Sequence, residues 1–253
     1  MPRGRKIAIL TRDFAMYHDL VRHLKEKDVA FASLAWGDEI PPDVGAVIST
    51  RKEATKIPFA NVAEFRTPSQ ALAEARALVE GGRTCESLVV GIDPGERPGV
   101  VVAVDGRERR AFQVGSPEAA VAEVARCAAT WKPRQTAVVR IGHGAPTARD
   151  RIVNGVVGLD LAVEIVDETA TSPTMPRAGE ARDVAAARAI AQSAGEEVRA
   201  RRPVRPAEGE IRDIQRKSRI ASGGDLTISR SLAMRVARGQ LTLEEAVERQ
   251  RQE

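Results

Sequence analysis

The apolar run LVVGI at residues 88–92 most constrains how this chain folds. It carries no polar side chain and ends at Asp93-Pro94-Gly95, so we expect a strand that is buried on both faces and ends in a tight turn. The segment PGVVVAVDGRERRAFQV (98–114) predicts two further strands joined at Asp105-Gly106, because this dipeptide readily adopts the positive φ angles of a hairpin turn. A sheet with helical cover is therefore the expected core of the chain.

Strand and helix patterns alternate after this hairpin. Three strands in hairpin order, followed by helix, strand, helix, strand and helix, predict an α/β unit at residues 85–195 with a mixed five-stranded sheet. The later elements are expected as a helix from Ser116-Pro117 through Trp131, a strand at QTAVVRIG (135–142), a helix at 146–157, a strand at LAVEIVD (161–167) and a helix at 179–194.

A smaller α/β domain is expected at residues 1–82. Thr67-Pro68-Ser69-Gln70 has the order of an N-cap, a proline in the first turn and a capping-box glutamine, so a helix is expected to begin there and to end near Glu80. The glycine pair at 81–82 is the expected boundary. The other predicted elements are strands at KIAIL (6–10), VAFASLAW (29–36) and VGAVIST (44–50), and an amphipathic helix at 17–27.

The C-terminal part changes character. Residues 196–208 are charged and interrupted by proline, which indicates a linker or a mobile arm, and residues 209–253 predict a basic region of three helices. Two of these helices resemble the layout of a helix-turn-helix, in which Arg230, Arg235 and Arg238 would face phosphates or bases. The alternative is a helical hairpin that docks on the rest of the chain or on a partner, and we favour it because the turn sequence is not distinctive.

Charge and composition narrow the function classes. The 253 residues carry 39 Lys plus Arg and 35 Asp plus Glu, a net charge of +4, and only 3% aromatic residues. Too few aromatic rings are present for a surface on which bases stack. Residues 1–84 carry +2, residues 85–195 carry −1 and residues 196–253 carry +3. Contact with nucleic-acid phosphates is therefore most strongly indicated in the C-terminal part.

The spacing of the cysteines and the length of the apolar runs indicate where in the cell the protein is expected. Cys85 and Cys127 lie far apart, without a Cys-x-x-Cys word or a nearby pair of histidines, so we expect neither a disulfide nor a structural zinc. No apolar run approaches the roughly 20 residues of a membrane span, and the sequence MPRGRKIAIL lacks the pattern of a cleaved signal. We therefore expect a soluble, cytoplasmic protein without a membrane partner.

Four carboxylates are candidates for a metal site. Asp93 ends the first central strand, Asp167 and Glu168 end the fifth, and Asp183 lies in the first turn of the last helix of that unit. Divalent ions such as Mg²⁺ take oxygen ligands, and carboxylates from separate elements must converge to hold them. From spacing alone, each acid is equally well a helix cap or a surface charge.

Several sequence words occur in an order that resembles a known superfamily. Residues 87–195, somewhat under half of the chain, resemble the ribonuclease H-like superfamily, and within it RuvC-type Holliday-junction resolvases and the YqgF family of resolvases and RNA-processing nucleases. The words are GIDPGERPG (91–99), WKPRQTAVVRIGHG (131–144), TARDRIVNGV (147–156), VEIVDETATS (163–172) and RDVAAARAIA (182–191).

The resemblance implies hydrolysis of phosphodiester bonds with Mg²⁺ or Mn²⁺. Asp93 would bridge two metals, Asp183 would hold one of them, and Glu168, with Asp167, would supply the remaining charge. The implied substrate is structured nucleic acid, with branched DNA ahead of structured RNA. Junction resolution needs two sites, which a homodimer would supply.

Departures from the family pattern leave other functions open. RuvC-type resolvases carry a glutamate near the position of Arg140, and a second helix aspartate where this chain has Ala186; the Arg of the YqgF-type Asp-Glu-Arg word is Thr169 here. A catalytically inactive protein of this fold, which binds nucleic acid or acts as a scaffold, is the alternative. An ATPase of the actin and sugar-kinase kind is a third hypothesis, although no second phosphate-binding glycine turn supports it.

The remaining candidates are single residues. For His143 we favour an ordinary loop histidine over the alternative, a histidine that positions a phosphate or a water molecule. Asp13 follows the first strand and was considered as a phosphoacceptor like that of a receiver domain, but no neighbouring acidic pair or suitably placed lysine supports that role. The candidate nucleic-acid contacts are Arg97, Arg140, Arg149, Arg230 and Arg235.

Overall fold

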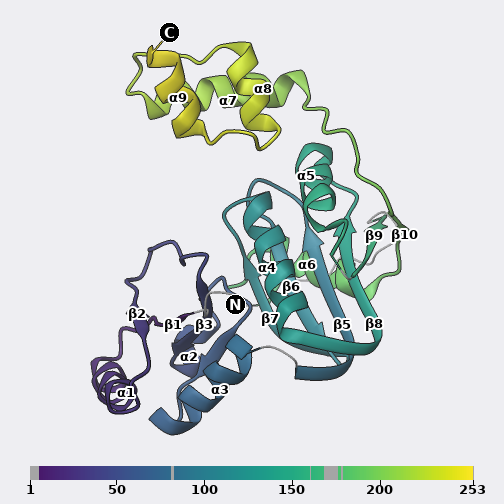
Figure 1. Ribbon diagram of the computed structural model, residues 1–253. Coiled ribbons are helices and arrows are strands. Elements are labelled where there is room, and N and C mark those ends of the chain that lie inside the picture. Colours follow the sequence, from purple (N-terminus) through teal and green to yellow (C-terminus); the bar gives the residue numbers. More distant parts are fainter. Residues whose placement is uncertain (1–5, 81–82, 160, 168–175, 178, 253) are drawn as a thin grey trace.

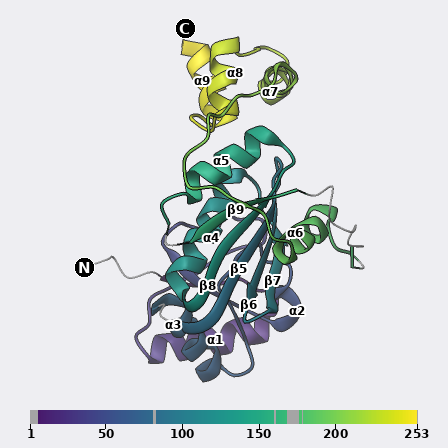
Figure 2. The same ribbon diagram turned by 90° about the vertical axis from the view of Figure 1, so that its right-hand side faces the viewer.

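The computed structural model describes residues 6–80, 83–159, 161–167, 176–177 and 179–252. It is an α/β chain with two sheets and a C-terminal group of helices (Figures 1 and 2). Within these ranges, no helix combines the length and the apolar character needed to cross a bilayer. Cys85 and Cys127 are both buried and carry free thiols in this structure.

The N-terminal sheet is fully parallel, with strand order β2-β1-β3-β4. Its predicted strands and both predicted helices are confirmed, whereas α2 and β4 were not predicted. Leu20, Leu24, Leu72 and Leu78 on α1 and α3 pack on one face of this sheet. The elements are β1 (Lys6–Ile9), α1 (Phe14–Glu26), β2 (Phe31–Ser33), β3 (Val44–Ser49), α2 (Arg51–Ala54), β4 (Val62–Glu64) and α3 (Pro68–Glu80).

The central sheet is mixed, with strand order β10-β9-β8-β5-β6-β7. Strands β5, β8 and β9 are parallel, and β6 is antiparallel to both of its neighbours. The expected five strands are therefore too few, because β10 adds an antiparallel edge strand beside β9. The elements are β5 (Arg83–Asp93), β6 (Gly99–Val104), β7 (Arg107–Gln113), α4 (Pro117–Thr130), β8 (Trp131–Gly142), α5 (Pro146–Val156), β9 (Ala162–Val166), α6 (Arg182–Gln192) and β10 (Glu196–Glu197).

Helices cover both faces of this sheet, α4 and α5 on one side and α6 on the other (Figure 2). Val90 and Ile92 on β5 belong to the core beneath α4 and α5, whereas Val89 packs with the α6 cluster. Side chains alternate between the faces of a strand, so Gly91 also faces α6. A Cβ at Gly91 would lie 2.4 Å from the Ala187 carbonyl oxygen, so glycine is what lets the helix approach this closely.

The hairpin between β6 and β7 turns at the expected dipeptide. Asp105 and Gly106 have φ angles of 53° and 70°, the left-handed conformation that a two-residue turn requires. The Asp105 carboxylate also accepts hydrogen bonds from the backbone N–H groups of Glu86 and Ser87, at 2.7 and 3.1 Å. This turn is thereby fixed to the start of β5.

The C-terminal helices form a separate small core that docks on the central unit. Thr147 donates a hydrogen bond to Glu210 at 2.7 Å, Arg151 donates to the Ala237 carbonyl at 3.3 Å, and Lys217 pairs with Glu96. These contacts agree with the docked hairpin that we favoured over a helix-turn-helix. The helices are α7 (Glu208–Ala221), α8 (Arg230–Ala237) and α9 (Leu243–Gln252), and their core includes Ile211, Ile228, Leu232, Leu241 and Val247.

Polar groups also join the N-terminal domain to α4 of the central unit. The Glu123 carboxylate accepts a hydrogen bond from the Ala60 N–H at 2.6 Å. Asn61 donates to the Thr130 hydroxyl at 2.9 Å, and both side chains are buried. Such fully buried partners fix the two units in one relative position.

Candidate functional site

A row of three residues crosses the central sheet where β5 ends. Asp93 is paired with Gly99 across β5 and β6, and Gly99 is paired with Gln113 across β6 and β7. Residues paired directly across strands share a face of the sheet. Asp93 lies two residues beyond Gly91, so the whole row faces α6.

Asp183 lies over this row, in the first turn of α6. A Cβ at Gly99 would be only 2.0 Å from the Asp183 carbonyl oxygen, which means that the backbone of Asp183 rests directly on Gly99. Asp93, the neighbour of Gly99 in the sheet, is therefore brought beside the start of α6. Two of the four predicted acidic residues thus both adjoin Gly99, from a strand and a helix that are far apart in sequence.

Gln113 completes this arrangement and was not predicted. Its side-chain amide donates a hydrogen bond of 2.5 Å to Asp183 Oδ2. This bond ties the end of β7 to the first turn of α6 and fixes the direction of the Asp183 carboxylate. No local sequence pattern marks a glutamine at the end of a hairpin strand as a site residue.

The side chain of Arg140 on β8 forms hydrogen bonds within the central unit. It is paired with Gly91 rather than standing level with Asp93. Its guanidinium donates to Glu164 on β9 at 3.0 Å and to the Ala191 carbonyl at the end of α6 at 2.8 Å. The arginine thus holds the helix against the sheet. Strand β8 contains no Asp or Glu that could take the place of the resolvase glutamate.

The acids after β9 are less fully defined. Asp167 follows β9 and is exposed, and Glu168 lies outside the described residues. Within the described part of the chain, no three His, Cys, Asp or Glu side chains group closely enough to hold a metal ion. Of the four predicted acids, Asp93 and Asp183 are accordingly the two that the structure brings next to the same residue, Gly99.

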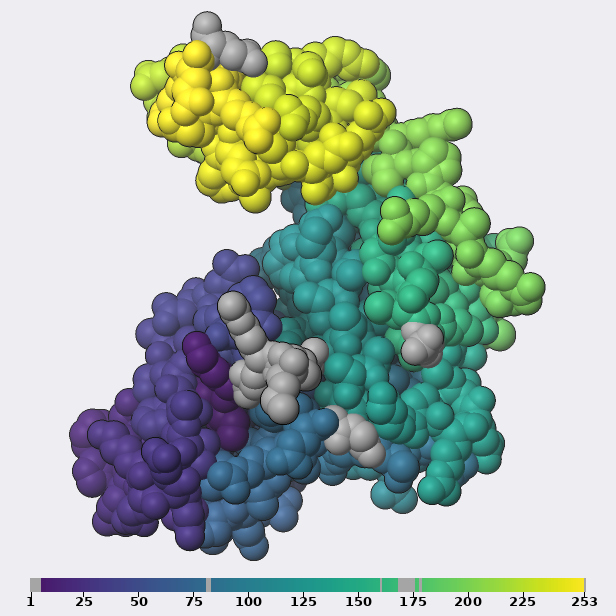
Figure 3. Space-filling view, in the orientation of Figure 1, coloured from purple at the N-terminus to yellow at the C-terminus, as the bar shows by residue number. Residues whose placement is uncertain are grey.

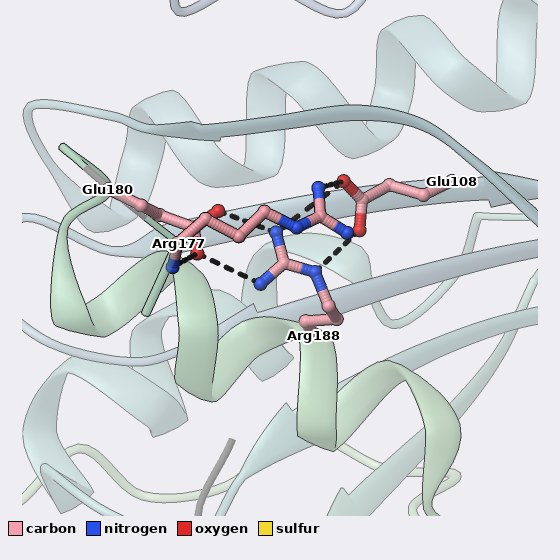
Figure 4. Close-up of polar contacts among 4 residues, drawn as sticks. All are labelled: Glu108, Arg177, Glu180 and Arg188. Atoms are coloured by element: carbon pink, nitrogen blue, oxygen red, sulfur yellow. Dashed lines mark hydrogen bonds and ion pairs between the residues drawn. The ribbon is translucent and has the colours of Figure 1, made fainter. Parts of the chain in front are cut away.

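An ion-pair cluster anchors α6 to the hairpin (Figure 4). The Arg188 guanidinium contacts Glu108 on β7 at 2.6 Å and Glu180 at 2.5 Å, and Arg177 contacts Glu108 at 2.8 Å. The hydrogen bond with Glu180 raises the Arg188 pKa, and the same bond lowers the Glu180 pKa. Because Arg188 follows Asp183 on the same helix, this cluster also fixes the position of that carboxylate.

The other predicted contact residues are dispersed. Arg97 is exposed in the loop after Asp93, Arg230 pairs with Glu208, and Arg235 is half-buried. Arg149 is only 5% exposed. Its guanidinium donates to Asp150 and to the His143 carbonyl, both at 2.9 Å, and therefore stabilises the fold. His143 itself is exposed.

Asp13 is a helix cap. Its carboxylate accepts a hydrogen bond from the Met16 N–H at 3.0 Å, at the start of α1. The acid at the carboxyl ends of β1 and β3 is Glu53 instead. It accepts hydrogen bonds from Thr11 and Thr50 at 2.5 and 2.8 Å, and from the Arg12 N–H at 2.8 Å.

Comparison with protein families finds two partial similarities. Residues 6–79 are similar to a response regulator receiver-like domain, and residues 207–253 to a three helical bundle domain. Neither similarity covers half of the chain, and both leave the central sheet outside. No curated protein and no solved structure matches the chain.

The receiver-like similarity was not predicted, because Asp13 was the one residue considered for a receiver-type role. The rejection of Asp13 as a phosphoacceptor concerned chemistry, whereas the similarity concerns a domain, and a fold does not carry one function. The alternation of short parallel strands and helices was the available signal for it. The N-terminal similarity therefore describes architecture and assigns no reaction.

Proposed function

We propose that residues 85–195 form a ribonuclease H-like domain and that the protein is a metal-dependent nuclease acting on structured nucleic acid, either branched DNA or structured RNA. The observation that carries this proposal is that Asp93 and Asp183 both adjoin Gly99, one through strand pairing and the other through its backbone. The strand order supports it, because three hairpin-ordered strands are followed by two parallel strands on the other side of β5. The words GIDPGERPG and RDVAAARAIA thus meet where the backbone of Asp183 rests on Gly99.

The described residues fit one hard cation better than two. Mg²⁺ in proteins is commonly held by one or two carboxylates, keeps several waters and takes substrate phosphates as further ligands. Asp93 and Asp183 offer such a pair of oxygen donors. When bound, the ion would polarise a phosphate and lower the pKa of a water molecule. A second ion would need Asp167 and Glu168.

The chain's own contribution is to hold these carboxylates in place. Gln113 donates to one oxygen of Asp183 and leaves the other oxygen for a ligand. Gly99 removes the side chain that would push α6 away from Asp93. The Arg188 ion pairs with Glu108 and Glu180 hold the same helix farther along its length. A preorganised site of this kind loses little free energy to rearrangement when a ligand binds.

Arg140 favours a second candidate function. It stands near the position where resolvases carry a glutamate, and its guanidinium is committed to Glu164 and Ala191. A chain that has replaced one acid of the site with a structural arginine could retain nucleic-acid binding without hydrolysis. This second candidate is a ribonuclease H-like protein that binds or organises nucleic acid.

Cleavage assays on end-labelled junctions, forks, duplexes and RNA, with Mg²⁺ or Mn²⁺, separate the two candidates. Residues that only support metal ligands typically contribute 10- to 100-fold to activity, so we expect Asp93→Asn and Asp183→Asn each to lower cleavage by roughly 100-fold or more. Asp225→Asn is the control, because it makes the same change at an exposed residue of the bundle. Full cleavage by both site variants would contradict the assignment, and binding without cleavage by the unmodified protein would favour the second candidate.

A further inference from the structure

Residues 198–205, here called the arginine arm, connect β10 to the C-terminal helices. The arm contains Arg199, Arg201, Arg202 and Arg205, and all four are exposed. Figure 3 shows this light-green segment along the outer edge of the molecule between the central unit and the bundle. Four arginines in such a short exposed segment form the densest positive charge in the chain.

The arm is held against the central unit by hydrogen bonds at two points. The Val198 N–H donates to the Val163 carbonyl on β9 at 2.8 Å, which extends the pairing of β10. Asn154 on α5 then binds the backbone of Arg202 from both sides. Its Oδ1 accepts from the Arg202 N–H at 2.7 Å, and its Nδ2 donates to the Arg202 carbonyl at 2.8 Å.

The arm holds two arginines away from local acids. Arg199 pairs with Glu197 at 2.7 Å, and Arg202 contacts Asp150 at 3.0 Å. Arg201 and Arg205 form no ion pair with any residue that the structure describes. Their guanidinium groups are therefore available to an external anion.

A cavity of about 500 Å³ lies beside the arm. It is lined by residues 196–202 together with His143, Arg149 and Ile165. His143 follows β8, and its N–H donates to the Val166 carbonyl at the end of β9, at 2.9 Å. The cavity thus opens at the carboxyl ends of β8 and β9, the edge of the sheet from which Asp93 and Asp167 also come.

We propose that the arginine arm binds the phosphodiester backbone of the nucleic acid on which the protein acts. Guanidinium groups match phosphate geometry, and a segment that is already fixed loses less conformational entropy when it binds. The inference rests on the proposed function and deepens it, because it states where the substrate backbone is held outside the carboxylate site. Binding is charge-driven and independent of base sequence.

The first test measures binding in EDTA, so that cleavage does not interfere. Fluorescence anisotropy with a 20-base-pair DNA duplex, and in parallel with an RNA duplex of the same length, gives Kd from low to moderate salt. We expect Arg201→Ala/Arg205→Ala to raise Kd roughly 10- to 100-fold at 0.1 M salt and to reduce the slope of log K against log salt by about 2. Arg22→Ala/Arg76→Ala is the control, since it removes the same charge from exposed helical sites of the N-terminal domain.

The second variant changes the position of the arm without changing its charge. Asn154→Ala releases the Arg202 backbone, and we expect it to raise Kd roughly 3- to 10-fold, because the arm must then be ordered on binding. Circular dichroism of each variant verifies that the fold is retained. If Asn154 only stabilised the fold, Asn154→Ala would lower the thermal stability and leave Kd unchanged.

The outcomes distinguish this inference from the proposed nuclease function. If the double arginine variant binds both duplexes with the Kd and salt slope of the unmodified protein, the arm proposal is wrong, even where Asp93→Asn abolishes cleavage. If the unmodified protein binds neither duplex, the arm proposal is equally overturned. If the arm variants lose affinity while the unmodified protein binds without cleaving, the arm proposal stands and the nuclease function fails.

Discussion

Glu53 shows how one side chain organises the end of the N-terminal sheet. Its carboxylate accepts hydrogen bonds from Thr11 after β1, from the Arg12 N–H and from Thr50 after β3. Burial acts to raise the Glu53 pKa, but these hydrogen bonds outweigh it, and the pKa is lower in the folded protein than in the unfolded chain. The ionised carboxylate is therefore the form that stabilises this fold.

We predict that Glu53→Gln destabilises the protein by about 1 to 2 kcal/mol at pH 7, through the loss of charge-assisted hydrogen bonds. Because the folded pKa is lowered, the contribution of Glu53 is complete above its unfolded pKa and disappears as the pH falls through its folded pKa. Urea unfolding of both proteins between pH 7 and pH 3 measures this dependence. A difference in unfolding free energy that stays constant over this range would contradict the role assigned to the ionised carboxylate.

Residue roles were predictable from the sequence only where they depend on a motif. Asp93 and Asp183 were predicted as site residues because ordered sequence words resemble a superfamily, and both adjoin Gly99 in the structure. Gln113 and Arg140 act through residues about 70 and 50 positions away, Asp183 and Ala191, and no local pattern encodes such contacts. Their roles become visible only when the sheet order and the position of α6 are known.

At the scale of elements, α6 is positioned by glycines on the strands beneath it. Gly91 and Gly99 stand where a Cβ would lie within 2.4 Å of the helix backbone. Close backbone approach was predicted at the glycines around Asp93, and the element that approaches is α6, which begins at Arg182. The close approach of α6, and with it the position of the Asp183 backbone, therefore depends on these two glycines.

Gly99→Ala tests this dependence. The added Cβ would meet the Asp183 carbonyl oxygen at 2.0 Å, so α6 must shift, and we expect a loss of about 1 to 3 kcal/mol in unfolding free energy. Gly115→Ala is the matched control, because its Cβ would meet nothing within 4 Å and its φ is not positive. Chemical denaturation measures both variants, and equal stability of the two would show that α6 is not closely packed at Gly99.

Local chemistry predicted elements well when the signal lay within a few residues. The Asp105-Gly106 hairpin and the helix after Thr67, whose hydroxyl accepts from the Gln70 N–H, are both present. Strand β10 was missed because two residues carry no periodicity, and its pairing depends on β9. Helix α2 did carry a signal, since Thr50 and Glu53 have the spacing of a capping box.

At the scale of the whole molecule, a buried ion pair on α4 joins the two sheets. Arg126 contacts Glu123 at 3.4 Å, donates to the Val44 carbonyl at 3.0 Å and lies 4.0 Å from the ring centre of Phe59. Burial raises the Glu123 pKa, although the charge of Arg126 acts to lower it. The N-terminal domain and the central unit therefore share one desolvated charge cluster, and we expect them to unfold together.

Arg126→Ala should uncouple the two units. It leaves the Glu123 carboxylate buried without its ion-pair partner, a change that typically costs about 3 to 5 kcal/mol. Each unit contains one tryptophan, Trp36 and Trp131, so Trp36→Phe and Trp131→Phe versions report on the units separately. In proteins that retain Arg126, the urea unfolding transitions reported by Trp36 fluorescence and by Trp131 fluorescence should coincide. In the Arg126→Ala proteins, the transition reported by Trp36 should move to a lower urea concentration.

An exposed ion pair supplies the control for Arg126→Ala, and Glu123 makes the effect of that substitution depend on pH. Arg134→Ala removes an exposed ion pair with Glu86 and should cost at most about 1 kcal/mol, without separating the transitions. Because the folded Glu123 pKa is raised, its effect on stability becomes less favourable as the pH rises from the unfolded pKa through the folded pKa. The Arg126→Ala protein should accordingly be less impaired at pH 5 than at pH 8. Coincident Trp36 and Trp131 transitions at both pH values would show that the units are held together by other contacts.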